Sequence, residues 1–395
     1  MKRRPAGKGQ RSAKRGSTLL MRRRRASPAA GVYTPQKQCT NPASRHELDA
    51  RTVAAKSKVK LEDILAWKHG INVVRKLVKS KLVTAPNHCP FCSGTKITSL
   101  SAAVRGLGWR CKTKGCKKRI LVSHVSKVFH GGRGGVNLRL QVAILWCAVW
   151  RVQQWLVPAI VRGANRNAVD TMCNAWRETL SKFMEEQQEF IKFGNFPNST
   201  ELAEEIETDE FVVRKETGDD IDGHPVVSWQ EFVNMKRRGD RKSLYVSRRD
   251  PSQSVSAVNS KGFAVPPPYS KEEWKPLRDR RFKPGASGIN HTDGLPAYTA
   301  QPPGWQGDKV SHGRSKAKGG PEFVGKRRHT SQDGRVHATV GSTQALDSIG
   351  GHLKHNVGQV NARFPGRVSE RIREGQWHHW VKAEDKWEAA AVVLR

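Results

Sequence analysis

Three separated carboxylates in the second half of the chain are the residues whose types and spacing point to chemistry. Asp209 stands in an acidic run, residues 204–210, that continues into a short β-prone stretch. Asp293 follows a predicted strand, and Asp347 lies on a helix predicted over residues 342–356. Three such carboxylates can hold two divalent cations against a phosphodiester, so that DNA is cut without a covalent protein intermediate.

The acidic run also has a simpler interpretation. In a chain with 71 Lys plus Arg and 35 Asp plus Glu, most carboxylates face solvent or pair with nearby cations. The adjacent pair Asp209 and Glu210 favours a metal site only because Asp293 and Asp347 follow later in suitable contexts. We therefore predict metal binding from the three contexts together and not from any single Asp.

Four cysteines form two close pairs, Cys89 with Cys92 and Cys111 with Cys116. Two Cys pairs on tight turns, brought together across a hairpin, make a tetrahedral thiolate site for structural Zn²⁺. We predict a zinc ribbon over residues 87–124, with coincidental free thiols as the alternative. Within this ribbon several basic residues suit phosphate contacts. These predicted DNA contacts are Arg110, Lys112, Lys117, Lys118 and Arg119.

The remaining cysteines and nearby histidines are not needed for this site. His88 and His124 flank a complete set of four Cys and are predicted to be bystanders. Cys39, Cys147 and Cys173 have no close Cys neighbour and are predicted to be structural or incidental. Seven cysteines in this arrangement indicate a reduced metal-binding protein and argue against a secreted disulfide framework.

The charge balance indicates a polyanionic partner. The formal net charge of +36 over 395 residues favours nucleic acid as the partner. The length allows two or three domains of about 100–200 residues each. A membrane span is not expected, since the longest apolar run, residues 142–150, is far shorter than the roughly 20 residues required. That run is better interpreted as a buried core helix.

The N-terminal 58 residues are predicted to be a disordered basic arm. Residues 1–46 hold 13 Lys or Arg and no acidic residue, and Glu47 is the first acid. Such a segment cannot bury enough apolar surface to fold alone. Its basic clusters suit a nuclear-import signal or a phosphate-binding arm, while a solvated tail and an organelle transit peptide are the alternatives. Of these interpretations we favour the nucleus.

Two helical regions surround the predicted ribbon. Residues 59–86 carry apolar positions at helical spacing and are predicted to form one or two lead-in helices. Residues 136–193 are predicted to form two helices, separated near Pro158 by a glycine-containing turn, in a helix-turn-helix-like pattern. If this segment binds DNA, its polar residues are candidates for groove contacts. The predicted contacts are Arg166, Asn167 and Arg177.

The C-terminal half offers weaker local signals. A strand is predicted at residues 242–247, and Ser270 is predicted to cap a short helix. Residues 299–340 are basic and Gly-rich, with almost no periodicity, and no regular element is predicted there. Residues 361–395 are assigned as a C-terminal extension, in which His378 and His379 lie beside Trp residues and are expected to pack.

The order of these motifs resembles the Merlin and ISXO-type insertion-sequence transposases. The shared features are the four-Cys ribbon, the helical segment, an I-x-x-D-E strand at Asp209, a T-D-x-x-x-A-Y turn at Asp293, and an acid followed seven residues later by Lys354. The resemblance covers about residues 85–360. It implies a ribonuclease-H-like α/β catalytic domain over residues 201–360, within a mixed α+β chain.

The resemblance also implies roles for individual residues. Asp209, Asp293 and Asp347 would be the catalytic acids that hold Mg²⁺ or Mn²⁺, and Lys354 would contact DNA phosphate from the face of Asp347. Structural Zn²⁺ would lie on the four Cys. The expected partners are the terminal inverted repeats of a mobile element, bound by a homo-oligomer of this chain.

Two departures from the family pattern leave alternatives open. The third acid is Asp347, where the family commonly has Glu, and the next residues lack the usual bulky aromatic and include Gly350 and Gly351. A domesticated or decayed relative that binds DNA without cutting it is therefore the competing hypothesis. A basic structural protein of chromatin or ribosomes with a zinc ribbon is a third.

Overall fold

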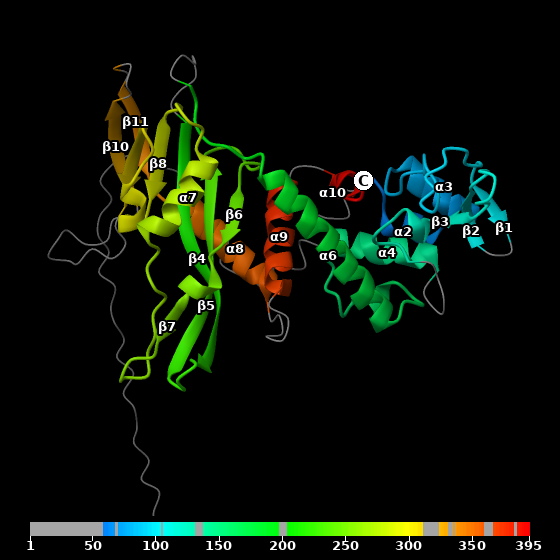
Figure 1. Ribbon diagram of the computed structural model, residues 1–395, viewed down its shortest axis with the longest axis horizontal. Coiled ribbons are helices and arrows are strands. Elements are labelled where there is room, and N and C mark those ends of the chain that lie inside the picture. Colours follow the sequence, from blue (N-terminus) through cyan, green and yellow to red (C-terminus); the bar gives the residue numbers. More distant parts are fainter. Residues whose placement is uncertain are drawn as a thin grey trace, which may run out of the picture. The chain divides into compact units, whose positions relative to one another are not determined.

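The computed structural model describes a mixed α+β protein whose largest sheet contains both parallel and antiparallel strands (Figure 1). The predicted basic arm, residues 1–58, lies outside the described part of the chain except for Lys58. The described residues are 58–67, 70–103, 106–130, 137–196, 204–310, 324–330, 334, 336–358, 366–382 and 385–395.

Short elements precede and contain the cysteine pairs. The predicted lead-in forms two helices, α2 (Leu61–Leu65) and α3 (Ile71–Lys79), with the apolar face of α3 buried. A small antiparallel sheet of order β1-β2-β3 follows. Its strands are β1 (Ser101–Ala103), β2 (Gly106–Arg110) and β3 (Arg119–Leu121), and a single 3-10 turn, η1 (Val122–His124), comes next.

The apolar run predicted to be a core helix is α4 (Leu138–Val149), which is buried along nearly its whole length. It ends earlier than the predicted helix because Arg151, just beyond it, adopts a left-handed φ of 59°. Pro158 then lies in the first turn of a separate short helix, α5 (Val157–Ile160). The second predicted helix is α6 (Arg166–Gln188), capped by the Asn165 side chain.

The main sheet has the strand order β6-β5-β4-β8-β9, with β7 pairing the far end of β5. Neighbouring strands from β6 to β4 are antiparallel, whereas β8 runs parallel to β4 and β9 parallel to β8. The strands are β4 (Glu204–Asp219), β5 (Pro225–Arg237), β6 (Tyr245–Arg248), β7 (Val255–Ala257), β8 (Gly288–Thr292) and β9 (Trp305–Lys309).

Side chains from alternate residues of β4 enter two different cores. Phe211 packs with Leu346 and Leu353 of α8 (Gln344–Val357), a helix that contacts β4 (Figure 1). Ile206 belongs to a separate core with Trp274 of α7 (Lys271–Arg281). The Ser270 cap of α7 is present as predicted, with Glu273 completing the capping box. Both faces of the sheet are therefore covered around β4.

Regular structure occurs in the segment where none was predicted. Besides β9, an antiparallel hairpin is formed by β10 (Gly325–Thr330) and β11 (Val336–Gly341). Apart from Gly325 the residues of β10 are polar or basic, whereas β11 alternates Val336, Ala338 and Val340 with other residues but leaves both valines exposed. Hydrophobic periodicity was therefore a poor guide to these strands.

The C-terminal residues pack against the helices of residues 136–193 and against α8. α9 (Gly366–Trp380) contacts α6 and α8, and α10 (Lys386–Val393) contacts α4. Trp377 of α9 meets Trp176 of α6 edge to face, with ring centroids 5.6 Å apart. His378 is buried beside Trp377, so this residue packs as expected.

Candidate functional site

The sheet topology brings together the three predicted acids from distant parts of the sequence. Asp209 lies in β4, Asp293 directly follows β8, and Asp347 lies in the first turn of α8. Glu207 of β4 is in register with His291 of the parallel strand β8. Both strands run on in the same direction, and Asp293 therefore emerges beside Asp209.

The carboxylates form one compact cluster. Single carboxylate oxygens of Asp209, Glu210 and Asp293 all lie within 4.8 Å of one another. Asp347 lies near enough to Asp209 for its negative charge to raise the pKa of Asp209, but it is not among the three carboxylates that lie within 4.8 Å of one another. Asp209 is only 8% exposed, whereas Asp347 lies on an exposed side of α8. The cluster therefore has a buried carboxylate, Asp209, and a solvent-facing one, Asp347.

The cluster is electrostatically strained without a cation. Burial, together with the negative charges of Asp347, Glu210 and Asp293, raises the pKa of Asp209 to about 9. Burial also raises the pKa of Glu210 to about 8, against the opposing effect of a hydrogen bond from Tyr298. A bound divalent cation would favour the ionised carboxylates and reverse both shifts. Clustered carboxylate oxygens are also the ligands that Mg²⁺ and Mn²⁺ prefer.

Glu210 is part of the cluster although its predicted role was only that of a neighbour. The alternation of β4 directs Glu210 to the face opposite Phe211, where the buried Tyr298 donates a hydrogen bond to its carboxylate. The sequence signals were the adjacency of Glu210 to Asp209 and the Tyr at the end of the turn motif. Neither signal indicated that these two side chains meet.

A tight turn places Asp293. The Asp293 carboxylate accepts a hydrogen bond from the backbone N–H of Leu295 at 3.1 Å, which closes an Asx turn. Gly294 between them adopts φ +86°, and a Cβ at this position would lie 3.1 Å from the Val310 carbonyl oxygen. A side chain at position 294 would therefore strain the turn that presents Asp293.

The other acids of the run follow the simpler interpretation. Glu204 pairs with Arg237 at 3.0 Å, and Arg238 pairs with Glu205 at 2.7 Å and Glu207 at 3.0 Å. These three carboxylates therefore balance two arginines of this chain, Arg237 at the end of β5 and Arg238 just after it. Of the acids in this run, Asp209 and Glu210 are those that enter the cluster.

His291, two residues before Asp293, is a buried link that sequence reasoning missed. It is 1% exposed, and its ring nitrogens contact Asp308 of β9 at 2.8 Å and Glu205 of β4 at 3.0 Å. Burial disfavours the charged ring, but hydrogen bonds that the ring donates to the two carboxylates outweigh this effect and raise the pKa of His291. The contacts join three adjacent strands beneath the cluster.

Lys354 is further from the acids. It lies on α8 seven residues after Asp347, which corresponds to about 10 Å along the helix axis. Its side chain is exposed on the same side of the helix. This placement is suitable for a ligand that extends along α8 from the acidic cluster.

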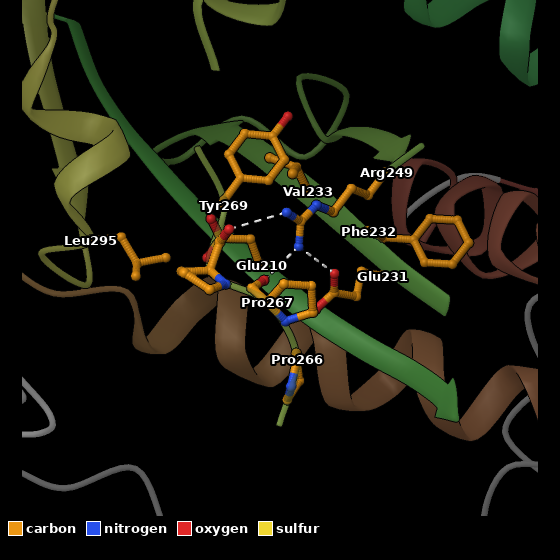
Figure 2. Close-up of a pocket in the computed structure, with 10 residues that line it drawn as sticks. Glu210, Glu231, Phe232, Val233, Arg249, Pro266, Pro267, Tyr269 and Leu295 are labelled. Carbon is orange, nitrogen blue, oxygen red and sulfur yellow. Dashed lines mark hydrogen bonds and ion pairs between the residues drawn. The ribbon is translucent and has the colours of Figure 1, made fainter. Parts of the chain in front are cut away.

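A cavity of about 270 Å³ lies next to the cluster, with Glu210, Tyr269 and Leu295 in its wall (Figure 2). Arg249 also lines this cavity. Its guanidinium donates hydrogen bonds to the Glu231 carboxylate at 2.6 Å and to the Pro267 carbonyl oxygen at 2.6 Å. Arg249 also pairs with Glu273 of α7. These contacts fix the guanidinium and so give this side of the site a rigid wall.

The four paired cysteines form the second cluster. Their Sγ atoms all lie within 4.8 Å of one another, with Cys89 and Cys116 at 3.7 Å and Cys92 and Cys111 at 3.6 Å. Thiolates at the corners of a tetrahedron with metal bonds of about 2.3 Å would be about 3.8 Å apart. These separations exclude disulfides, whose sulfurs lie about 2 Å apart. The donor set therefore fits a tetrahedral metal ion.

The residues around this cluster are ordered by local contacts. Hydrogen bonding from Thr113 is the main cause that lowers the pKa of the Cys111 thiol to about 7. His124 bonds to the Leu121 backbone N–H at 3.0 Å and packs on Phe91 with ring centroids 5.1 Å apart. His124 thus has packing partners outside the four thiols. Cys147 and Cys173 are buried free thiols in the helical region.

The predicted DNA contacts differ in accessibility. Most have exposed or half-buried side chains; these are Arg110, Lys112, Lys117, Lys118, Arg119, Arg166 and Asn167. Arg177 is different, because it is 7% exposed and pairs with the buried Glu374 of α9 at 3.3 Å. Its guanidinium holds α6 to α9 in this structure and is not presented to solvent.

Comparisons of the chain with protein family models, curated proteins and solved structures found no match. Among the described residues, none of the helices combines the length and apolar character needed to cross a bilayer. The functional argument therefore depends on the two clusters and on the surfaces around them.

Proposed function

We propose that this chain is a DNA transposase of the ISXO-type or Merlin-like class that cleaves phosphodiester bonds and transfers DNA strands with two metal ions. The observation that carries the proposal is that Asp209 of β4 and Asp293 after β8 lie within 4.8 Å of each other, with Asp347 of α8 near enough to raise the pKa of Asp209. Three carboxylates from separate elements are costly to gather in one place unless a cation offsets their repulsion.

The sheet supports the ribonuclease-H-like fold that the sequence resemblance implies. Its first three strands form an antiparallel meander, and β8 and β9 then extend the sheet parallel to β4. One acid lies on the central strand β4, one at the carboxyl end of its parallel neighbour, and one on a helix packed against β4. This arrangement is consistent with such a catalytic domain.

In this proposal Asp209, Asp293 and Asp347 hold Mg²⁺ or Mn²⁺, with Glu210 available as a further carboxylate. Ions held by these carboxylates would supply Lewis-acid chemistry, namely activation of the attacking water or DNA 3′-hydroxyl and stabilisation of the leaving oxygen. The chain itself supplies the rigid arrangement: the Asx turn orients Asp293, and the hydrogen bond from Tyr298 orients Glu210. Lys354, further along α8, would contact DNA phosphate.

DNA binding is assigned to the basic surfaces outside the cluster. Zn²⁺ on Cys89, Cys92, Cys111 and Cys116 would stiffen the segment that presents Arg110, Lys112, Lys117, Lys118 and Arg119. Arg166 and Asn167 at the start of α6 are exposed and would add contacts. We propose double-stranded DNA, including the terminal inverted repeats of a mobile element, as the partner of a homo-oligomer.

The test is nicking of supercoiled DNA by the purified full chain with Mn²⁺ or Mg²⁺. We expect metal-dependent cutting by the wild type and loss of cutting in Asp293→Asn. Asp279→Asn is the matched control, since Asp279 is an exposed aspartate paired with Arg278 on α7. Equal background from all three proteins, with DNA binding intact, would instead support the competing proposal of a transposase-derived protein that binds DNA without cutting it.

A further inference from the structure

Asp347 has the shortest acidic side chain available, so its helix must lie close to β4 for its carboxyl group to reach Asp209. We infer that Glu207, Arg238 and Gly350 are positioning residues that hold α8 near enough to β4 for Asp347 to complete the metal site. This inference rests on the proposed function, because it concerns how the third acid of that site is delivered.

Glu207 caps α8 from another element. Thr343, at the N-cap position of α8, makes no side-chain cap hydrogen bond. The backbone N–H of Leu346 in the first turn instead donates to the Glu207 carboxylate of β4 at 3.2 Å. A carboxylate is favourable at a helix N-terminus, where unpaired N–H groups carry partial positive charge. Because Leu346 directly precedes Asp347, this bond fixes the helix at the point where the acid leaves it.

Arg238 joins the same carboxylate to the backbone that leads into α8. Its guanidinium donates to Glu207 at 3.0 Å and to Glu205 at 2.7 Å. The same group donates to the carbonyl oxygens of Val340 at 2.6 Å and Ser342 at 2.9 Å. The rigid, planar fork of Arg therefore connects two acids of β4 with the residues just before α8.

Gly350 permits the close approach of the two elements. It lies one helical turn after Asp347 and is buried, and a Cβ placed there would lie 3.4 Å from Cβ of Phe211 on β4. A single methyl group would already be in contact, so a larger side chain would push α8 away from the sheet. At the next position, Gly351, a Cβ would meet no atom within 4 Å.

All three features affect the distance between α8 and β4. Glu207 and Arg238 fix the start of α8 against β4. One turn later, Gly350 has no side chain that would hold α8 away from β4. If α8 moved outward, the short Asp347 would lose contact with a metal held by Asp209, whereas a Glu at this position would still reach it. A misplacement of about 1 Å can cost on the order of 100-fold in rate.

The experiment uses the full chain and compares Glu207→Gln and Gly350→Leu, each with and without Asp347→Glu. Initial rates of Mn²⁺-dependent nicking and the affinity for Mn²⁺, measured by electron paramagnetic resonance, are the two readouts. We expect each positioning variant to nick about 10- to 100-fold more slowly than the wild type while binding DNA equally well. Asp347→Glu should lower the nicking rate of the wild type. In both positioning variants it should instead raise the nicking rate at least about tenfold.

Matched controls separate positioning from general damage. Gly351→Leu changes the same residue type on the same helix, and Glu204→Gln removes a buried carboxylate of β4 that pairs with Arg237. Both controls should nick like the wild type and gain nothing from Asp347→Glu. Loss of fold alone would lower the thermal midpoint and would not be repaired by a longer acid.

The outcomes also distinguish this inference from the proposed function. Variants that behave like their controls, or that Asp347→Glu fails to restore, would overturn the inference. A wild type that binds Mn²⁺ but does not nick DNA would refute the proposed function alone. The inference is then decided by Mn²⁺ affinity, which should fall in both variants and recover with Asp347→Glu. A wild type that binds no Mn²⁺ would overturn both.

Discussion

The Tyr298 hydroxyl donates a hydrogen bond to the Glu210 carboxylate, which ties the turn after β8 to the strand that carries Asp209. Tyr298 is 2% exposed, and burial and the charge of Glu210 raise its pKa well above the usual value. The phenol therefore stays protonated and acts as a fixed donor. It provides a neutral contact to an acid that has other acids as neighbours.

Tyr298→Phe should remove this donor and leave the Glu210 carboxylate less well satisfied. We expect the free energy of unfolding to fall by about 1–3 kcal/mol, the usual cost of an unpaired buried polar group. Thermal or urea unfolding in the presence of a chelator would measure it. Tyr269→Phe is the control, because its hydroxyl donates a long hydrogen bond of 3.4 Å to the Glu273 backbone carbonyl, and its loss of unfolding free energy should be smaller.

The sequence predicted the elements that carry the acids better than the contacts that position them. Asp209, Asp293 and Asp347 were found from residue type, order and local context, and the structure brings them together, while their roles stay predictions. Glu207 and Arg238 were not found, because their pairing follows from which strands become neighbours. No local pattern encodes that choice of neighbours.

Other contacts were hidden for a related reason. His291 looked like an ordinary strand residue, and its link to Asp308 exists only because β9 joins the sheet beside β8. β10 was missed since its polar and basic residues resemble a solvated loop, and β11 since its three alternating apolar residues stand in a basic, Gly-rich segment. Arg177 was predicted to face DNA because helical position alone did not show that α9 would cover it.

Asp209→Asn should stabilise the protein when no divalent cation is present. The folded-state pKa of Asp209 is raised from the ordinary 3.8 to about 9, so its ionisation disfavours the folded state. Stability of the metal-free wild type should therefore fall as pH rises from about 5 to 9, since the folded state holds the proton more tightly. At pH 8 the variant should gain at least about 1 kcal/mol, because one pKa unit corresponds to about 1.4 kcal/mol.

Chemical unfolding at several pH values with a chelator would measure this effect. The decrease of unfolding free energy with pH should become smaller in Asp209→Asn. It should persist in Asp279→Asn, whose carboxylate lies on the surface of α7. Adding Mn²⁺ should flatten the slope in the wild type. A wild type whose stability rises over this pH range would contradict the electrostatic description of the cluster.

Cys111→Ser should abolish metal binding at the thiol cluster. We expect about one Zn²⁺ per chain in the wild type and a large loss in the variant, because structural zinc needs all four ligands. Trp109, which is 4% exposed beside Cys111, should become accessible and its fluorescence should shift to the red. Metal analysis and fluorescence measure the two effects. Cys147→Ser, at a buried thiol in α4, should retain its zinc.

Arg177→Ala and Arg166→Ala should separate packing from DNA binding. Removing Arg177 leaves Glu374 without its α6 partner and should destabilise the protein by about 3 kcal/mol, as for other buried ion pairs. Arg166 is exposed, and its loss should weaken DNA binding and reduce the salt slope by about 1 without changing stability.

Thermal unfolding and fluorescence anisotropy with labelled duplex DNA at several salt concentrations give the two quantities. Arg371, which also contacts Glu374 at 3.1 Å, could partly replace Arg177, so Arg371→Ala should enhance the stability loss of Arg177→Ala. An Arg177→Ala protein of normal stability and weakened DNA binding would show that this guanidinium is presented to DNA after all.

The hydrogen bonds from Arg238 to the carbonyl groups of Val340 and Ser342 also have an evolutionary consequence. The β10–β11 hairpin ends at Gly341, between these two anchored residues. Exposed positions earlier in the hairpin, such as Lys326 and Arg328, can therefore change between related chains without shifting the start of α8. Arg327 and His329 instead contact Asp308 and Gln306 of β9, so the exposed positions are those at which to graft a reporter or a new DNA-contacting peptide.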